Sequence, residues 1–552
     1  MKKPKVFTIQ TFNRAMKFVS CLIALTLFLP VARPVVNRNS GAPLPRIQSL
    51  LQQMAVKSPK QTVAVIVQKS EPSKQADDLV TLLGGKITRD LHIINGFVAE
   101  MSASAAVELA NSDSVRWVSL DSPMVETAKG NPTPTPTPSP TYRLSTPNLK
   151  TVYNQEIGAD KLWAEGYQGS GVTVAVVDSG VAIASPDLTK SSQRVLAMSI
   201  FAGGASTTNP DMFGHGTHIA GTIGGDGYSS NGGYIGVAPK VNLVSVKVSD
   251  DTGIATASSV VAGLQWVNDN AVKYNIRVVN LSLNATVTQS YNVDPIDAAV
   301  EILWFNKIVV VVSAGNNGSA ALYPPANDPF VITVGAVDDK GTVSIGDDIV
   351  TNFSAYGTTA DGFAKPDLVA PGNNIISINS GSYSVLAKAH PANIVETNYF
   401  RMSGTSTAAP IVSGAVALLL QDEPGLNPDQ VKYRLKDTAN KSWPGYNSAQ
   451  AGAGMLDAYA AVKGTTTQTA NTGTRLSNLL TTGPNGVQQS SVSWSSVSWS
   501  SVSWSSVSWS SVSWSSVSWS SDYWADGVSG ASLAENEEDN RQTRLYLPVI
   551  VQ

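Results

Sequence analysis

The sequence predicts an α/β protein with a mostly parallel central sheet covered by helices, which gives three layers. First, short β-branched runs alternate with helical stretches through residues 151–463. Second, these runs are continuously apolar, which is typical of strands buried on both faces of a sheet. Third, polar motifs directly follow several of the runs, and open α/β sheets place their sites at the carboxyl ends of parallel strands.

The elements of this module follow one another as strand, helix and strand. The expected strands span 172–177, 243–248, 278–283, 308–312 and 331–337. The expected helices span 219–223, 257–272, 296–305 and 408–420. Their lengths and their runs of Val, Ile and Leu fit one large module.

A smaller α+β unit is expected at residues 61–126. Its apolar patterns predict strands at 62–67, 94–101 and 115–120. Helical spacing predicts helices at 73–83 and 104–110. The unit therefore precedes the larger module as a domain of its own.

Two further segments are set apart by composition. Residues 128–142 contain a run in which proline alternates with threonine or serine, and this pattern forces an extended linker. Residues 464–552 form a tail in which the pentapeptide Ser-Ser-Val-Ser-Trp repeats over 490–521. A period of five fits neither helix nor strand. The repeats are therefore either a low-complexity spacer or a row of tryptophans that stack on polysaccharide rings or neighbouring chains.

The first 32 residues have the pattern of an export signal. Lysines and an arginine precede an apolar run at 18–29, which Pro30 closes. This run is short for a membrane span and suits a signal-peptide core, although a retained anchor stays open as the alternative. We therefore expect a secreted or extracellular protein.

Composition excludes several classes of protein. The 552-residue chain has a formal net charge of −3 and no long basic run, so we expect no nucleic-acid partner. Its single cysteine, Cys21, lies in the apolar N-terminal run. Intrachain disulfides, cysteine metal sites and cysteine nucleophiles are therefore excluded.

Three motifs in the module carry the residue types of nucleophilic catalysis. Asp178 follows the first strand, His215 lies between two glycines, and Ser406 precedes an apolar helix. In this chain order an acid orients a base that takes the proton of a serine hydroxyl. Asp-Ser-Gly alone is a common turn, and Gly-Thr-Ser alone is commoner still. Four motifs in order, counting the one that contains Asn316, argue against coincidence.

Acyl transfer also needs donors for the developing oxyanion. The backbone N–H of Ser406, at a helix N-terminus, is one candidate. The side-chain amide of Asn316, which follows the strand 308–312, is the second.

These segments resemble the subtilisin-like serine proteases. The motifs that carry the resemblance are Asp178-Ser-Gly-Val, His215-Gly-Thr-His-Ile-Ala-Gly, Ser313-Ala-Gly-Asn316 and Gly404-Thr-Ser406-Thr-Ala-Ala-Pro. The resemblance implies a three-layer subtilisin-like fold and endopeptidase activity on protein or peptide substrates. It also implies that residues 61–126 are a propeptide that inhibits the enzyme until it is cleaved, at a site between about Asp121 and Tyr142. It implies substrate-binding roles for Ser282, Leu283, Asn284, Ala314 and Gly315.

Some residues depart from the family pattern. Thr407 stands where methionine is usual, and Asn284 stands where glycine is common beside the substrate's P1 side chain. Leu322 aligns with the base of that P1 site, so the resemblance implies a shallower site than usual.

The resemblance implies no cofactor for the chemistry. It leaves structural calcium open, with Asp226 and Asn231 as oxygen donors in the loop 224–233. No metal ligand set can be named from the spacing alone.

Two functions from different classes remain. The first is a secreted serine endopeptidase made as a self-processed zymogen. The alternative is a surface-attached binding or structural protein whose tryptophan repeats contact polysaccharide or the cell surface.

Overall fold

The computed structural model describes residues 46–126, 148–203, 205–207, 210–318, 322–483 and 486–489. The predicted export segment 1–32, the whole linker 128–142 and the repeats 490–521 lie outside these residues. Among the described residues, no helix has the length and apolar character needed to cross a bilayer.

The N-terminal unit is a four-stranded antiparallel sheet in the order β2-β3-β1-β4, packed on helices. It has a hydrophobic core of its own, which includes Leu51, Val80, Phe97 and Leu109. Its elements are α2 (Ser49–Lys57), β1 (Thr62–Lys69), α3 (Gln75–Leu82), β2 (Lys86–Leu91), η1 (His92–Ile94), β3 (Gly96–Ser102), α4 (Ala103–Ala110), β4 (Val115–Leu120) and β5 (Pro123–Glu126).

Strands β2 and β5 and helix α2 were not predicted from the sequence. In β2 only Leu91 is fully buried and the other residues alternate between exposed and half-buried. An edge strand of this kind has too few apolar residues to stand out in the sequence. The three predicted strands and two predicted helices of this unit have counterparts in the structure.

The larger module is built on an eight-stranded sheet. Its strand order is β14-β13-β12-β10-β6-β8-β7, and β17 also pairs with β13. All neighbours are parallel except the pair β13 and β14. The strands are β6 (Thr173–Asp178), β7 (Val195–Ile200), β8 (Asn242–Lys247), β10 (Ile276–Leu281), β12 (Val309–Ser313), β13 (Ile332–Asp338), β14 (Ile349–Val350) and β17 (Leu368–Pro371).

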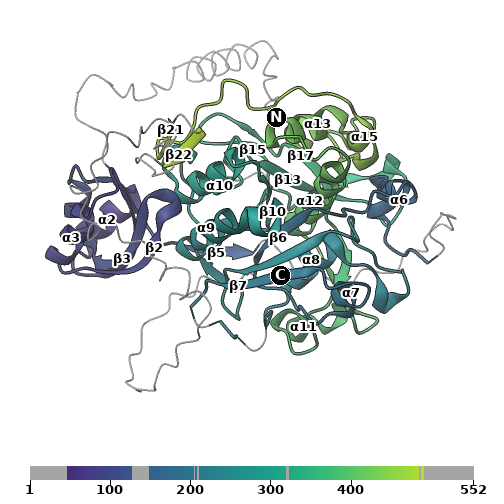
Figure 1. Cartoon of the computed structure of the whole chain (residues 1–552), viewed down its shortest axis with the longest axis horizontal. Coiled ribbons are helices and arrows are strands. Elements are labelled where there is room, and N and C mark those ends of the chain that lie inside the picture. The colour runs from purple at the N-terminus through teal and green to yellow at the C-terminus, as the bar shows by residue number, and fades with distance from the viewer. Residues whose placement is uncertain are drawn as a thin grey trace, which may run out of the picture. The chain divides into compact units, whose positions relative to one another are not determined.

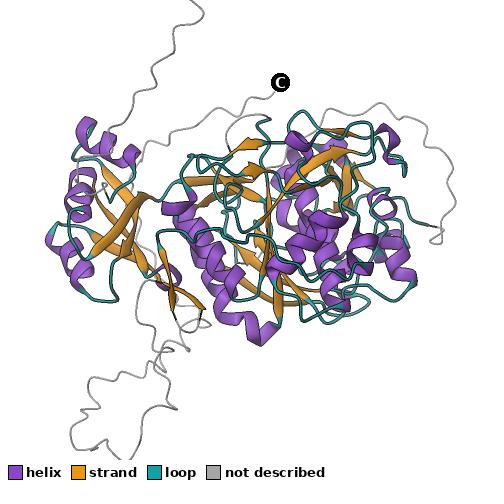
Figure 2. Ribbon diagram, turned by 90° about the horizontal axis from the view of Figure 1, so that it is seen from above, coloured by secondary structure: helices purple, strands orange, loops and turns teal. Residues whose placement is uncertain are grey.

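Helices cover both faces of this sheet, as predicted. Figure 1 shows α9 (Ala257–Tyr274) and α10 (Pro295–Phe305) together on one face, and α8 (His215–Gly224) and α12 (Thr405–Asp422) on the other. The view from above in Figure 2 shows the same order of helix, sheet and helix. The three-layer α/β prediction with a mostly parallel sheet is therefore confirmed.

Smaller elements surround the sheet. Three short sheets have the strand orders β11-β5-β9, β18-β20-β19 and β15-β16, and β21 pairs with β22. Their strands are β9 (Ile254–Thr256), β11 (Leu283–Ala285), β15 (Gly357–Thr358), β16 (Ala364–Lys365), β18 (Ile375–Ile378), β19 (Ile394–Val395), β20 (Tyr399–Met402), β21 (Leu480–Gly483) and β22 (Gly486–Gln489). The remaining α-helices are α5 (Tyr153–Glu156), α6 (Ala159–Ala164), α7 (Pro186–Thr189), α11 (Val385–Ala389), α13 (Pro428–Thr438), α14 (Ser448–Ala451) and α15 (Ala458–Lys463). Four short 3-10 turns complete the set: η2 (Tyr228–Ser230), η3 (Tyr291–Val293), η4 (Ile345–Asp347) and η5 (Pro391–Asn393).

The chain does not leave the folded body where the tail was expected to begin. Leu479 and Leu480 are buried and belong to the main hydrophobic core. The segment 464–480 is polar and poor in periodic pattern, so its packing depends on partners that lie far away in the sequence.

Candidate active site

Asp178 and His215 form a buried pair at the carboxyl edge of the sheet. Asp178 is the last residue of β6, and His215 is the first residue of α8. The His215 Nδ1 atom lies 2.7 Å from Asp178 Oδ1, and both residues are 0% exposed. Oδ1 also accepts a hydrogen bond from the backbone N–H of Ser179 at 2.8 Å. A carboxylate held in this way fixes the orientation and the tautomer of the imidazole.

Asp211 holds the two ends of this pair together, a role that the sequence did not reveal. Its carboxylate accepts from the backbone N–H groups of Gly214 and Thr217, both at 2.8 Å, at the start of α8. It also accepts from Ser179 Oγ at 2.9 Å, beside Asp178. The only signal in the sequence is its position four residues before His215, which no motif marks.

Ser406 is fully buried in the first turn of α12. The helix begins at Thr405, three residues earlier than the apolar run predicts. Within the described residues, Ser406 Oγ makes no hydrogen bond, and α12 packs against α8, the helix that carries His215. A buried hydroxyl without a partner is uncommon and requires an explanation, which a reacting group would supply.

Asn316 is oriented by Thr405, the residue before Ser406. Asn316 Oδ1 accepts from the Thr405 N–H at 2.9 Å and from Thr405 Oγ1 at 3.1 Å. Its Nδ2 is buried and lacks a hydrogen-bond partner among the described residues. Because the oxygen end is anchored beside the serine, the amide N–H₂ is a preorganised donor next to Ser406.

A buried chain of polar side chains fixes α12 on the sheet. Ser413 Oγ donates to Asn280 Oδ1 at 2.9 Å, and Asn280 Nδ2 donates to Ser282 Oγ at 2.8 Å. Ser282 Oγ in turn donates to the carbonyl oxygen of Ser406 at 3.0 Å. This network sets the depth of Ser406 relative to β10.

One strand of the N-terminal unit runs beside the strand 283–285. Strand β5 pairs antiparallel with β11 on one side and with β9 on the other. The register places Glu126 opposite Leu283 and Val125 opposite Asn284. The chain thus supplies an extended segment between two strand edges, as a bound peptide would.

The segments that carry the predicted substrate-binding residues are joined by a hydrogen bond. Asn284 is buried, and its Nδ2 donates to the carbonyl oxygen of Ser313 at 3.1 Å. Ala314 packs with Leu322 and Ala355 in a small buried cluster. The Asn284 side chain therefore occupies space between β11 and the segment 313–315.

Comparison with known proteins identifies the family. A model of the subtilase family matches residues 169–460, which are more than half of the chain. The chain belongs to the subtilase family. Serine protease AprX of Bacillus subtilis is 41% identical over 304 residues, 54% of this chain and 67% of that protein. Subtilisin E of Bacillus subtilis is 30% identical over 456 residues, 81% of this chain and 98% of that protein.

A solved structure agrees with this assignment. Fervidolysin from Fervidobacterium pennivorans, a keratinolytic enzyme related to subtilisin, matches with a TM-score of 0.55 and 26% identity. The match covers 74% of this chain and 61% of fervidolysin. The predicted subtilisin-like fold and serine endopeptidase class are thereby confirmed.

His218 lies one turn after His215 and has a different environment in this subtilase. Its Nε2 lies 3.1 Å from the carbonyl oxygens of Ile375 and Phe400, on β18 and β20. Burial lowers the pKa of His218 to about 3, with a further contribution from His215. A neutral His218 that donates to these carbonyls fastens α8 to the neighbouring small sheet.

The loop 224–233 does not fit a calcium site. Asp226 Oδ2 lies 3.6 Å from the guanidinium of Arg194, which also donates to the carbonyl oxygens of Asp187 and Gly224. The carbonyl oxygen of Asn231 accepts from Asn148 at 2.9 Å. Among the described residues, no group of three or more His, Cys, Asp or Glu could hold a metal ion. An arginine already supplies positive charge to the oxygens that calcium would need.

The side chain of Thr407 is held by hydrogen bonds as well as by packing. Its Oγ1 lies 3.0 Å from the carbonyl oxygen of Gly372 and 2.9 Å from that of Gly404. A methionine could not make these contacts. The departure from the family pattern therefore places two hydrogen bonds beneath the helix N-terminus.

Proposed function

We propose that this subtilase is a secreted endopeptidase, made as a zymogen that inhibits and then processes itself. The observation that carries the proposal is strand β5, which lies between β9 and β11 in the chain's own fold. A segment bound in this way blocks the strand edges that a substrate peptide would use. It is covalently part of the N-terminal unit, whose core also includes Leu51 of α2 and which we assign as the propeptide.

Asp178, His215 and Ser406 are assigned as the catalytic triad. His215 takes the proton of Ser406 Oγ as that oxygen attacks the scissile carbonyl carbon, and Asp178 stabilises the resulting imidazolium. His215 then gives the proton to the leaving amine, so the peptide C–N bond breaks and an acyl-enzyme remains. A water molecule, deprotonated by the same imidazole, hydrolyses the ester and restores Ser406.

The oxyanion of each tetrahedral intermediate is assigned to two donors. Asn316 Nδ2 has no other partner among the described residues, and the Ser406 N–H lies at the start of α12. Both donors are set in place by the fold before substrate binds, which is the property that makes such donors effective. Every step uses groups of this chain.

The substrate would bind as an extended strand. We assign its backbone contacts to Ser282, Leu283 and Asn284, and the wall opposite Asn284 to Ala314 and Gly315. The pairing of β5 with β11 supports this assignment, because it shows the register that one extended segment adopts there. The side chain of Asn284 fills part of the space beside the P1 residue, so we propose a preference for small P1 side chains.

Export and attachment complete the proposal. The basic and apolar N-terminus supports secretion, and the linker 128–142 gives the propeptide a place to be cut soon after Glu126. The tryptophan repeats would act as a spacer or as a contact to polysaccharide at the cell surface. A binding protein centred on those repeats is not favoured, because the family match covers the module that contains the triad candidates.

The test is paired expression of the full chain and its Ser406→Ala variant, followed by intact mass and hydrolysis of an unstructured protein. We expect the parent to lose its N-terminal unit and digest the substrate. The variant should remain full length and lose nearly all activity, by roughly 10⁶-fold, a value known for subtilisin itself. Equal behaviour of the two proteins would refute the proposal.

A further inference from the structure

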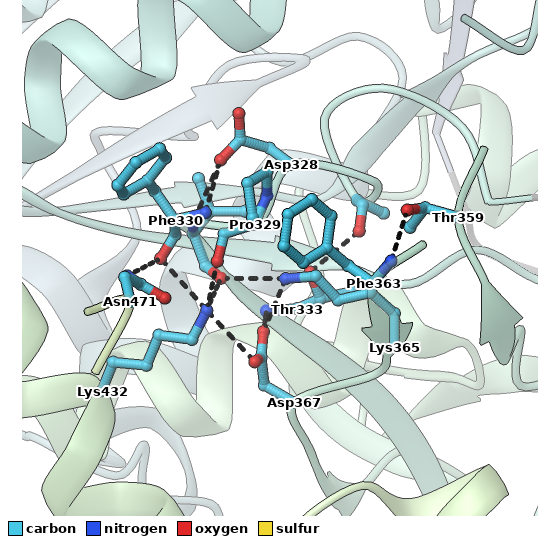
Figure 3. Close-up of polar contacts among 12 residues, drawn as sticks. Asp328, Pro329, Phe330, Thr333, Thr359, Phe363, Lys365, Asp367, Lys432 and Asn471 are labelled. Atoms are coloured by element: carbon cyan, nitrogen blue, oxygen red, sulfur yellow. Dashed lines mark hydrogen bonds and ion pairs between the residues drawn. The ribbon is translucent and has the colours of Figure 1, made fainter. Parts of the chain in front are cut away.

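The segment 466–480, named here the C-terminal strap, follows the last helix of the module and lies beyond the family match. Figure 1 shows it running from α15 to β21. At its start, the N–H of Ala470 donates to the carbonyl oxygen of Asp429 at 3.0 Å. Asn471 Nδ2 lies 2.7 Å from Asp429 Oδ1 and 3.2 Å from the carbonyl oxygen of Phe330. Figure 3 shows the contact between Asn471 and Phe330.

The end of the strap is held by buried contacts. The N–H of Ser477 donates to both carboxyl oxygens of Glu301 in α10, at 3.1 and 3.0 Å, in a buried position. The N–H of Asn478 donates to the carbonyl oxygen of Asn292 at 2.9 Å. Leu479 is 2% exposed and belongs to the main core. The strap is thus an integral part of the module.

The N-terminal unit contacts the strap at this same end. Gln68 of β1 is 2% exposed, and its Nε2 donates to the carbonyl oxygen of Leu479 at 3.0 Å in a buried contact. Arg116 of β4 donates to the carbonyl oxygen of Asn478 at 3.1 Å. The two donors come from neighbouring strands, since Gln68 pairs with Trp117 across the sheet. Trp117 itself packs against the main core.

We propose that the strap is a second docking site for the propeptide, separate from the strands that hold β5. The inference rests on the proposed function, because it assigns a role to the unit that we assign as propeptide. Two attachments on one folded unit act together. When one attachment opens, the other keeps the released part at a high effective concentration near its site, so it binds again. The strap therefore keeps the propeptide bound after its peptide bond to the enzyme is cut.

The first experiment measures release of the cut propeptide from the full-length protein. Gln68→Leu removes the donor to Leu479 and replaces it with an apolar side chain of similar size. Gln68 Oε1 has no partner among the described residues, so the substitution breaks no second hydrogen bond. Arg116→Met removes the donor to Asn478. Size-exclusion chromatography over time gives the half-life of the complex between the two cut parts.

We expect Gln68→Leu to shorten this half-life about tenfold, because a buried carbonyl loses its partner, and the double variant to shorten it further. The matched control is Arg46→Met, which removes an arginine that donates to the carbonyl oxygens of Ser112 and Val115 inside the N-terminal unit. A parental half-life in the double variant, or an equal loss in the control, would overturn the inference.

A second experiment does not depend on catalysis. In the Ser406→Ala background, amide hydrogen exchange of residues 474–480 is compared with and without the two substitutions. We expect faster exchange in the strap when both donors are gone, and unchanged exchange would also overturn the inference. If the parent chain never cuts itself, the proposed function fails while this second readout still decides the contact.

Discussion

Two histidines of this protein contact aspartate side chains, one in a buried position and one in an exposed position. His215 and Asp178 are 0% exposed at 2.7 Å, inside a network that fixes both residues. His92 lies between Asp90 at 2.9 Å and Asp269 at 3.2 Å, and its side chain is 52% exposed. The first contact is shielded from water and salt, whereas the second is screened by both. The comparison teaches that a buried contact can hold a histidine in one orientation for catalysis, whereas an exposed contact is weaker and can be released.

The strongest way to break this comparison is to neutralise the buried carboxylate. Asp178→Asn keeps the shape of the side chain but loses the negative charge to which we assign stabilisation of the imidazolium. We expect kcat/KM to fall by about 10⁴-fold, measured on a peptide substrate, with little change in Tm. Asp187→Asn is the control, because Asp187 is also buried but bonds to Tyr399 and Ser229. Activity within tenfold of the parent would remove Asp178 from the triad.

The next largest effect concerns the oriented amide. Asn316→Leu removes the donor that Thr405 holds in place, so transition-state stabilisation should fall while substrate binding is kept. We expect kcat to drop by about 10²–10³-fold, the magnitude known for an oxyanion-hole asparagine of subtilisin. KM should remain within a few fold of the parent value. A change confined to KM would instead give Asn316 a role in binding.

The sequence reveals the buried contact and hides the exposed one for physical reasons. Asp178, His215, Asn316 and Ser406 each lie in a short segment at the end of a strand or the start of a helix. Such segments combine small residues with one reactive side chain, so they can be recognised as short sequence motifs. His92, by contrast, looks like an ordinary surface histidine.

Contacts between distant segments left no comparable signal. Asp269 lies 177 residues after His92, on the exposed side of α9, and no motif links them. The same holds for the pairing of β5 with β9 and β11, which is made by backbone atoms, and for Asp211. The polar strap was missed because it packs against residues far away in the sequence, including hydrogen bonds with Glu301, Asn292 and Gln68.

A smaller effect is expected at the buried side chain of Asn284, where a substitution should change the preference for the substrate's P1 residue. Asn284→Gly opens the space between β11 and the segment 313–315 that its side chain now fills. We expect the ratio of kcat/KM for a Phe P1 peptide to that for an Ala P1 peptide to rise about tenfold, because apolar surface is then buried. Competition between the two peptides in one assay gives this ratio directly. An unchanged ratio would show that Asn284 does not limit the P1 site.

The smallest effect tests the exposed contact. Hydrogen bonds to Asp269 and then to Asp90 raise the pKa of His92 from 6.5 to about 9. Asp90 lies beside His92 in the same unit and stays with it after dissociation, so only the contact with Asp269 on α9 is lost. A histidine whose pKa is raised by such a partner stabilises the contact while it is protonated, and the stabilisation is lost as pH rises through about 9. The N-terminal unit should therefore dissociate faster from the cut enzyme above pH 9. Because the contact is half-exposed, we expect only roughly a threefold change in its rate.

His92→Gln removes the charge and so should abolish this pH dependence while releasing the propeptide at the faster rate at pH 7. His390→Gln is the matched control, since His390 lies at the C-terminal end of α11, away from the N-terminal unit. The rate is measured as the half-life of the cut complex at pH 7 and pH 10, at low and high salt. Added salt should shrink the difference between parent and variant, as it does for exposed charges. If the parent's dissociation rate does not change with pH, His92 does not help to hold the cut N-terminal unit on the enzyme. Exposure of a contact would then not be enough to make it a site of release.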